Sequence, residues 1–124
     1  MKKVIATSEA PKAVGPYSQA IEVNGTLYIS GQIPVNPADG QVQTEITAAA
    51  HQSLKNIGAI LAEAGMTYDN VVKTTVLLAD IADFKAVNEV YAEYFTGDKP
   101  ARACYQAAAL PLGVKVEIEA IAVK

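Results

Sequence analysis

A strand near the middle of the chain sets the fold: Asn70-Val71-Val72-Lys73-Thr74-Thr75-Val76-Leu77-Leu78-Ala79. β-Branched and apolar residues dominate this segment, which predicts a β-strand. Successive side chains of a strand point to opposite faces. One face therefore carries Val72, Val76 and Leu78, and the other carries Val71, Leu77 and Ala79. Because both faces are apolar, we expect both to be covered by other parts of the structure.

Amphipathic helices are predicted on both sides of this strand. The first runs from an N-cap at Thr44 to Gly65, and the second runs from Asp80 to Phe95. Asp80 and Asp83 suit the start of the second helix, where the helix dipole favours negative charge. The buried side of the first helix is expected to carry Ile46, Ala50, Leu54, Ile57, Leu61 and Ala64. The buried side of the second helix is expected to carry Phe84, Val87, Tyr91 and either Tyr94 or Phe95.

The N-terminal part of the chain predicts strands and a loop. A short strand is expected at residues 4–6. Residues 18–23 and 27–30 are expected to form a hairpin, because Asn24-Gly25 is the strongest short turn signal. Residues 31–40, which contain two prolines and an Asp-Gly pair, are expected to form a loop.

Two strands are predicted after the second helix, at residues 102–108 and 115–123. In the last strand one face carries Val116, Ile118, Ala120 and Ala122, and the other carries Glu117, Glu119, Ile121 and Val123. The order β-β-β-α-β-α-β-β predicts an α+β fold and a single domain over residues 1–124. Because two helices can cover only one face of so wide a sheet, we predict a homo-oligomer in which another copy covers the second face.

Composition excludes several function classes. The chain has 124 residues, a net charge of −3 and no Lys/Arg-rich run, so we expect no nucleic-acid partner. Cys104 is the only cysteine and His51 the only histidine, which exclude an intrachain disulfide and a histidine-rich metal site. No signal peptide and no apolar run of about 18 residues is present, so we expect no membrane partner and a cytoplasmic location.

Arg102 and Glu117 are the strongest candidates for chemistry. Ionised side chains are rarely buried without a partner, yet these two lie in neighbouring apolar strands. The donor fork of Arg102 matches a carboxylate, and Glu117 can orient a water for attack. The alternative interpretation is structural: Arg102 forms an ion pair, for example with Glu117, or Glu117 is a solvated surface residue like Glu119.

Four other residues are weaker candidates. Cys104 should share a sheet face with Arg102, and it is interpreted as a packing residue whose main-chain groups can touch a ligand, because no base lies nearby. Tyr17 and Ser30 occupy loop positions of the kind that often line sites. His51, alone on a helix, is interpreted as a surface or packing residue.

Several segments in order along the chain resemble the reactive intermediate deaminase family, also known as RidA or YjgF. They are Gly15-Pro16-Tyr17-Ser18-Gln19, Ser30-Gly31-Gln32-Ile33-Pro34, Val87-Asn88-Glu89-Val90-Tyr91, Pro100-Ala101-Arg102-Ala103-Cys104 and Val116-Glu117-Ile118-Glu119. The set is specific although no single segment is decisive. The resemblance implies a chorismate-mutase-like α+β fold, in which a mixed sheet carries two helices on one face, assembled as a homotrimer with clefts between subunits.

The resemblance also implies an activity and roles for individual residues. The activity is hydrolysis of enamines and imines derived from amino acids, such as 2-aminoacrylate, to a 2-keto acid and ammonia. Arg102 matches the arginine that grips the substrate carboxylate, and Glu117 matches the glutamate that positions the attacking water. The positions that match cleft-lining residues are Tyr17, Ser30, Gly31 and Cys104, with Tyr17 expected from the neighbouring subunit. Asn88 matches a structural position near the cleft.

This chemistry needs no metal, cofactor or covalent nucleophile, because an iminium carbon is already electrophilic. Three alternatives stay open at this point, and on one of them, a chaperone-like activity, the sequence is silent. The protein can be a non-catalytic module that binds 2-keto acids in the same clefts. It can also have the RNA-cleaving or translation-inhibiting role described for some relatives, against which the acidic charge balance and single histidine argue.

Overall fold

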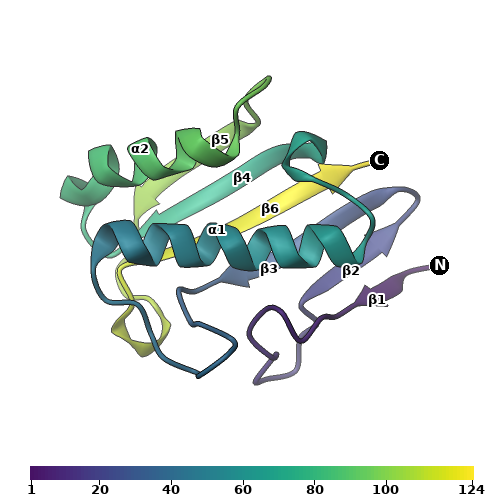
Figure 1. The fold of residues 1–124 in the computed structure, drawn as a ribbon, viewed down its shortest axis with the longest axis horizontal. Coiled ribbons are helices and arrows are strands. Elements are labelled where there is room, and N and C mark those ends of the chain that lie inside the picture. The colour runs from purple at the N-terminus through teal and green to yellow at the C-terminus, as the bar shows by residue number, and fades with distance from the viewer.

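Two α-helices lie side by side on one face of a six-stranded sheet (Figure 1). The computed structural model describes all residues from 1 to 124. The helices are α1 (Ile46–Glu63) and α2 (Phe84–Tyr94). The strands are β1 (Lys3–Ile5), β2 (Ala20–Val23), β3 (Thr26–Gln32), β4 (Val71–Leu78), β5 (Ala101–Gln106) and β6 (Val116–Val123). The predicted α+β fold and the predicted order of helices and strands are confirmed.

The sheet is mixed. Its strand order is β1-β2-β3-β6-β4-β5, and all neighbours are antiparallel except β4 and β5. α2 connects the parallel strands β4 and β5, and α1 connects β3 to β4 past β6. Both connections place their helix on the same face of the sheet, so no element of the chain covers the other face (Figure 1).

The turn between β2 and β3 follows the sequence signal. Asn24 and Gly25 have φ values of 50° and 79°, the left-handed pair of a hairpin turn that matches the twist of the strands. β3 then continues to Gln32, so the prediction of a loop from Gly31 onwards is wrong for its first two residues. The reason is a bulge: Ile29 pairs with Ala120 and Gln32 with Ile118, so the strand continues past Ser30 and Gly31, where its register with β6 shifts.

Both helices begin later than the sequence predicts. The N-cap of α1 is Glu45, not Thr44, because its carboxylate accepts hydrogen bonds from the backbone N–H groups of Thr47 and Ala48 at 2.9 and 3.0 Å. These bonds lower the pKa of Glu45. Before α2, Asp80 caps a separate 3₁₀ turn by accepting from the N–H of Ala82 at 2.9 Å.

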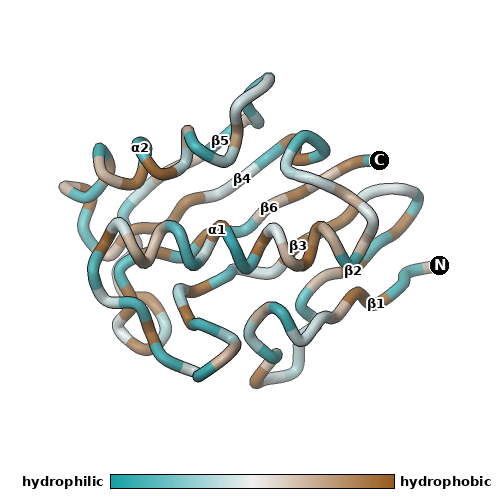
Figure 2. Tube along the Cα trace, in the orientation of Figure 1, coloured by the Kyte–Doolittle hydropathy of each residue, from teal (hydrophilic) through white to brown (hydrophobic).

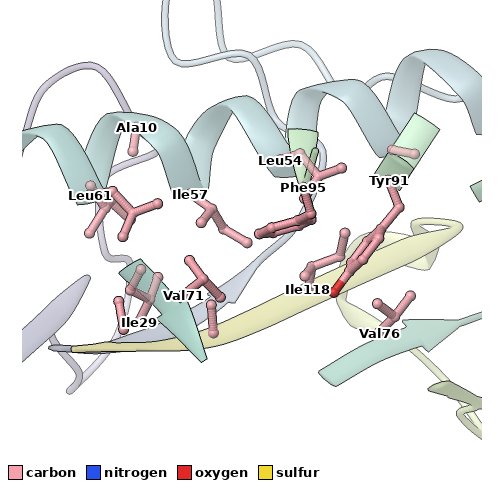
Figure 3. Packing of buried hydrophobic residues seen from close by; sticks show 14 of the residues in the cluster. Ala10, Ile29, Leu54, Ile57, Leu61, Val71, Val76, Tyr91, Phe95 and Ile118 are labelled. Carbon is pink, nitrogen blue, oxygen red and sulfur yellow. The ribbon is translucent and has the colours of Figure 1, made fainter. Parts of the chain in front are cut away.

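The hydrophobic core lies between α1, α2 and the sheet (Figure 3). Leu54, Ile57 and Leu61 of α1 are fully buried, as is Ile118 of β6. Hydrophobic and hydrophilic segments alternate along both helices, as amphipathic helices on a sheet require (Figure 2). Neither helix combines the length and the apolar character needed to cross a bilayer.

The predicted faces of the central strand are wrong at its start. Val71 is 5% exposed and Val72 is 48% exposed, so Val71 rather than Val72 joins Val76 and Leu78 in the core. The pairing of β4 with β6 shifts between Val71 and Lys73, and this irregularity reverses the alternation of side chains. The predicted alternation of β6 is confirmed, with Val116, Ile118, Ala120 and Ala122 buried.

The buried side of α2 also differs from the prediction. Val87, Val90 and Tyr91 are buried, together with Phe95 directly after the helix, whereas Phe84 is 39% exposed. Phe84 is the first residue of α2, and its ring lies close to Arg102 instead of in the core.

Substituting Leu54 by alanine should destabilise the protein by about 2–5 kcal/mol, because it leaves a cavity in a fully packed core. Leu112→Ala is the matched control, since Leu112 is 75% exposed, and its effect should stay within about 0.5 kcal/mol. Urea unfolding of the three proteins measures the difference. Equal losses for both variants would contradict the described core.

Candidate active site

The candidate residues form two groups on opposite faces of the sheet. Arg102 pairs in register with Thr74, and Glu117 pairs with Leu77. Thr74 and Leu77 are three positions apart on β4, so their side chains point to opposite faces. Thr74 is buried beneath α2. Arg102 therefore lies on the helix side, and Glu117 lies on the uncovered side.

Because of this separation, the interpretation of Arg102 and Glu117 as an ion pair is wrong. The ion pairs of the chain join Lys124 to Glu22 at 3.2 Å and His51 to Glu93 at 3.9 Å. No carboxylate of the chain forms an ion pair with Arg102. Its positive charge is left free for an anion from outside the chain.

The environment of Arg102 consists of neutral groups from α2. Its Nη1 donates a hydrogen bond of 2.7 Å to the side-chain oxygen of Asn88. The guanidinium carbon lies 4.9 Å from the ring centre of Tyr91 and 5.4 Å from that of Phe84. Cation–π contacts of this kind stabilise a guanidinium without neutralising it.

Cys104 lies on the same face as Arg102, as predicted, because it pairs with Val76, which is buried on the helix side. Burial raises the pKa of its thiol, and the opposing effect of Arg102 is smaller. The thiol is therefore protonated at neutral pH, which disfavours a nucleophilic role and agrees with a packing residue.

The main chain of Cys104 faces the open edge of the sheet. The N–H of Ala107 donates to the carbonyl of Leu78 at 2.9 Å, which fixes the alternation of hydrogen bonds between β4 and β5. In a parallel ladder, alternate residues direct their backbone groups to opposite sides. Residues 103, 105 and 107 therefore bond to β4, and Cys104 directs its N–H and C=O away from it. β5 is the last strand, so these groups are accessible to a ligand.

Glu117 lies over Gly31 on the uncovered face. A Cβ atom at position 31 would overlap the Glu117 carboxylate, so only glycine leaves room for this side chain. Burial raises the pKa of Glu117, and the negative charge of Glu119 raises it further. A partly buried carboxylate with a raised pKa is suited to accept a proton from water.

Tyr17 and Ser30 lie beside this second group. Tyr17 and Ser30 line a cavity of about 390 Å³, and Tyr17 and Gly31 line another of about 310 Å³. The hydroxyl of Ser30 donates to the carbonyl of Ser18 at 2.6 Å, which ties β3 to the loop that carries Tyr17. The structure thus brings Tyr17, Ser30, Gly31 and Glu117 together, apart from Arg102, Cys104 and Asn88.

Gln19 supports the loop next to the site, although sequence reasoning gave it no role. Its side-chain oxygen accepts from the N–H of Thr7, and its nitrogen donates to the carbonyls of Thr7, Ala10 and Pro11 at 2.7–3.3 Å. These bonds hold the loop that leads to Tyr17. The sequence did contain a signal, because this glutamine directly precedes an apolar strand. A buried amide at such a position is expected to be fully hydrogen-bonded.

His51 has a packing role, as predicted. Its Nδ1 lies 2.7 Å from the hydroxyl of Tyr94, and the two rings make an edge-to-face contact. These contacts join α1 to α2 and lie outside both groups of candidate residues.

Comparison with known proteins identifies the family of this chain. The profile of the family described as Endoribonuclease L-PSP matches residues 7–124. Two proteins named 2-iminobutanoate/2-iminopropanoate deaminase align over 125 residues, which cover 100% of this chain. The one from Mus musculus is 58% identical and is covered to 93% of its length, and the one from Homo sapiens is 56% identical and is covered to 91%.

Solved structures superpose along the whole chain. The Rid family protein YyfA from Yersinia pestis has a TM-score of 0.97 and 50% identity, with 100% of both chains covered. TdcF from E. coli, solved with bound serine, has a TM-score of 0.96 and 42% identity, with 98% of both chains covered. With a profile match over almost its full length and relatives above 50% identity, this chain belongs to the Endoribonuclease L-PSP family, the family of the Rid proteins.

Proposed function

We propose that this protein is an enzyme that hydrolyses 2-imino acids and their enamine forms, such as 2-aminoacrylate, to 2-keto acids and ammonia. The observation that carries this proposal is the Arg102 guanidinium, which is held by neutral groups and forms no ion pair within the chain. Such a group is suited to bind a small organic acid. The relatives named 2-iminobutanoate/2-iminopropanoate deaminase and the serine bound to TdcF support a substrate of amino-acid size.

Arg102 binds the substrate carboxylate in this proposal. One N–H of the guanidinium is occupied by Asn88, and the remaining donors can form two parallel bonds to a carboxylate. The main chain of Cys104, at the open edge of β5, can then contact the polar atoms at C2 of the substrate. Binding at these two points orients the imine for attack.

Glu117 directs the attacking water. The water oxygen bonds to C2 as the C=N double bond becomes a single bond, one water proton passes to Glu117, and Glu117 returns it to the nitrogen to give a tetrahedral amino alcohol. Glu117 then takes the hydroxyl proton of this intermediate and passes it to the nitrogen, and the C2–N bond breaks to release ammonia and the 2-keto acid. The raised pKa of Glu117 suits both the acceptance and the return of a proton.

The site lies between copies of the chain. Within one chain, Arg102 and Glu117 point to opposite faces of the sheet, so a small acid cannot reach both. In the proposed chorismate-mutase-like homotrimer, the uncovered sheet faces pack inward. Arg102, Asn88 and Cys104 of one copy then face Tyr17, Ser30, Gly31 and Glu117 of the next. The exposed rings of Tyr28 and Tyr105 on the uncovered face support such packing.

A role in RNA cleavage, which the family description names, is less well supported by this chain. The net charge is −3, which disfavours a phosphate backbone, and His51 is engaged between the two helices.

Replacing Arg102 by alanine should remove a charge-assisted contact worth about 2–5 kcal/mol, and so lower kcat/KM by roughly thirtyfold to several thousandfold. The assay generates 2-aminoacrylate from serine with a pyridoxal-phosphate lyase and follows release of pyruvate above the spontaneous rate. Lys99→Ala removes an exposed positive charge nearby in the sequence and serves as control. Full activity of Arg102→Ala at low substrate would refute the assignment.

The enzymatic rate should fall as the pH is lowered. Because the pKa of Glu117 is raised, the midpoint of this fall should lie above pH 4.5, the ordinary pKa of glutamate. The carboxylate form is the active one, so activity is present above the raised pKa and is lost as pH falls through it. Glu119→Gln removes one cause of the shift and should move this limb to lower pH. Glu117→Gln should remove the limb and lower kcat by roughly a hundredfold or more. An unchanged pH profile in Glu119→Gln and full activity in Glu117→Gln would count against a base at position 117.

Sedimentation equilibrium should give the mass of three chains at micromolar concentration. Tyr28→Glu places a charge on the uncovered sheet face and should shift the protein towards monomer. Ile81→Glu is the matched control, because Ile81 is 47% exposed and Tyr28 49%, but Ile81 lies in the turn before α2. A stable monomer of the unmodified protein would exclude a site shared between copies.

A further inference from the structure

One face of α2 forms a shelf under the guanidinium of Arg102. Phe84, Asn88 and Tyr91 are spaced by four and three residues, so they lie on the same side of the helix. All three contact Arg102: Asn88 through a hydrogen bond of 2.7 Å, and the two rings through their faces at 5.4 and 4.9 Å. The arginine is thus held by one hydrogen bond and two ring contacts from the same helix.

The shelf is itself anchored to the strand beside Arg102. The hydroxyl of Tyr91 forms a buried hydrogen bond of 2.7 Å with the hydroxyl of Thr74. Thr74 is the register partner of Arg102 on β4. The ring of Tyr91 also packs against that of Phe95, with 4.5 Å between the ring centres. These contacts therefore fix α2 against β4 next to the guanidinium of Arg102.

The three side chains of the shelf carry no charge, and this feature bears on how Arg102 binds an anion. α2 also carries Glu89 and Glu93 on other positions, but neither forms an ion pair with Arg102. An amide oxygen at position 88 accepts one N–H of the guanidinium without cancelling its charge. An aspartate has the same shape but would form a permanent ion pair there.

We propose that Asn88 is a positioning residue that holds the Arg102 guanidinium through a neutral acceptor, so that its full positive charge remains for the substrate carboxylate. Phe84 and Tyr91 act with it by restricting the guanidinium plane. The proposal deepens the function proposed above and rests on Arg102 as the carboxylate anchor.

The test compares Asn88→Asp with Asn88→Ala. If Asn88 were only structural, the isosteric aspartate would be the milder change. If its neutrality matters, aspartate is the more damaging change, because it adds a carboxylate that competes with the substrate. We expect Asn88→Asp to raise the Kd for pyruvate, a stable 2-keto acid, by at least about tenfold, and Asn88→Ala to raise it by only about threefold, a smaller loss than that of a full charge-assisted contact.

Two further measurements separate this effect from loss of structure. In Asn88→Asp, KM should rise with Kd while kcat changes by less than about threefold, and the melting temperature should not fall, because the new ion pair stabilises the fold. Lys85→Gln changes the net charge by the same amount at an exposed position of α2 and should leave Kd unchanged.

The outcomes distinguish this inference from the proposed function. If Arg102→Ala loses pyruvate binding but Asn88→Asp binds as the unmodified protein does, or better than Asn88→Ala, only the role of Asn88 is refuted. If Arg102→Ala binds pyruvate normally, the carboxylate anchor and the role of Asn88 both fail. Calorimetric titration of the five proteins, with KM and kcat from the pyruvate-release assay, gives these answers.

Discussion

The packing of α1 against β3 and β6 is the constraint on which the remaining structure depends. The side chains of Leu54, Ile57 and Leu61 are removed completely from water against one face of the sheet. Because both helices follow strands that run in the same direction, they are confined to that face. The chain therefore divides its sheet into a face that it buries itself and a face that it leaves open.

The candidate site reflects the same division. Arg102 lies on the helix side, next to the shelf on α2, and Glu117 lies on the open side above Gly31. In the proposed function, a single copy thus offers a group to bind the substrate carboxylate and a separate group to activate water. Contact between copies, which the open face favours, is the simplest way to unite them. Under the proposed function, catalysis therefore requires assembly.

Each of the two charged groups is held in partly buried surroundings without an opposite charge from the chain. For Arg102 the desolvation cost is offset by the Asn88 amide and the aromatic rings of α2. For Glu117 the desolvation cost is not offset by such contacts, and it raises the pKa of the carboxyl group. A guanidinium held by fixed neutral contacts keeps its positive charge and loses conformational freedom, which lowers the entropy cost of binding a carboxylate.

The sequence by itself determined the order of helices and strands, the hairpin turn at Asn24-Gly25 and the two faces of β6, because each depends on periodicity within one element or on the backbone preference of a turn. It also pointed to Arg102 and Glu117 as candidates for catalytic and binding roles. Only the tertiary structure decided that these two lie on opposite faces, and that Val71 rather than Val72 is buried. Those facts depend on register and bulges between strands far apart in the chain, which local patterns do not encode.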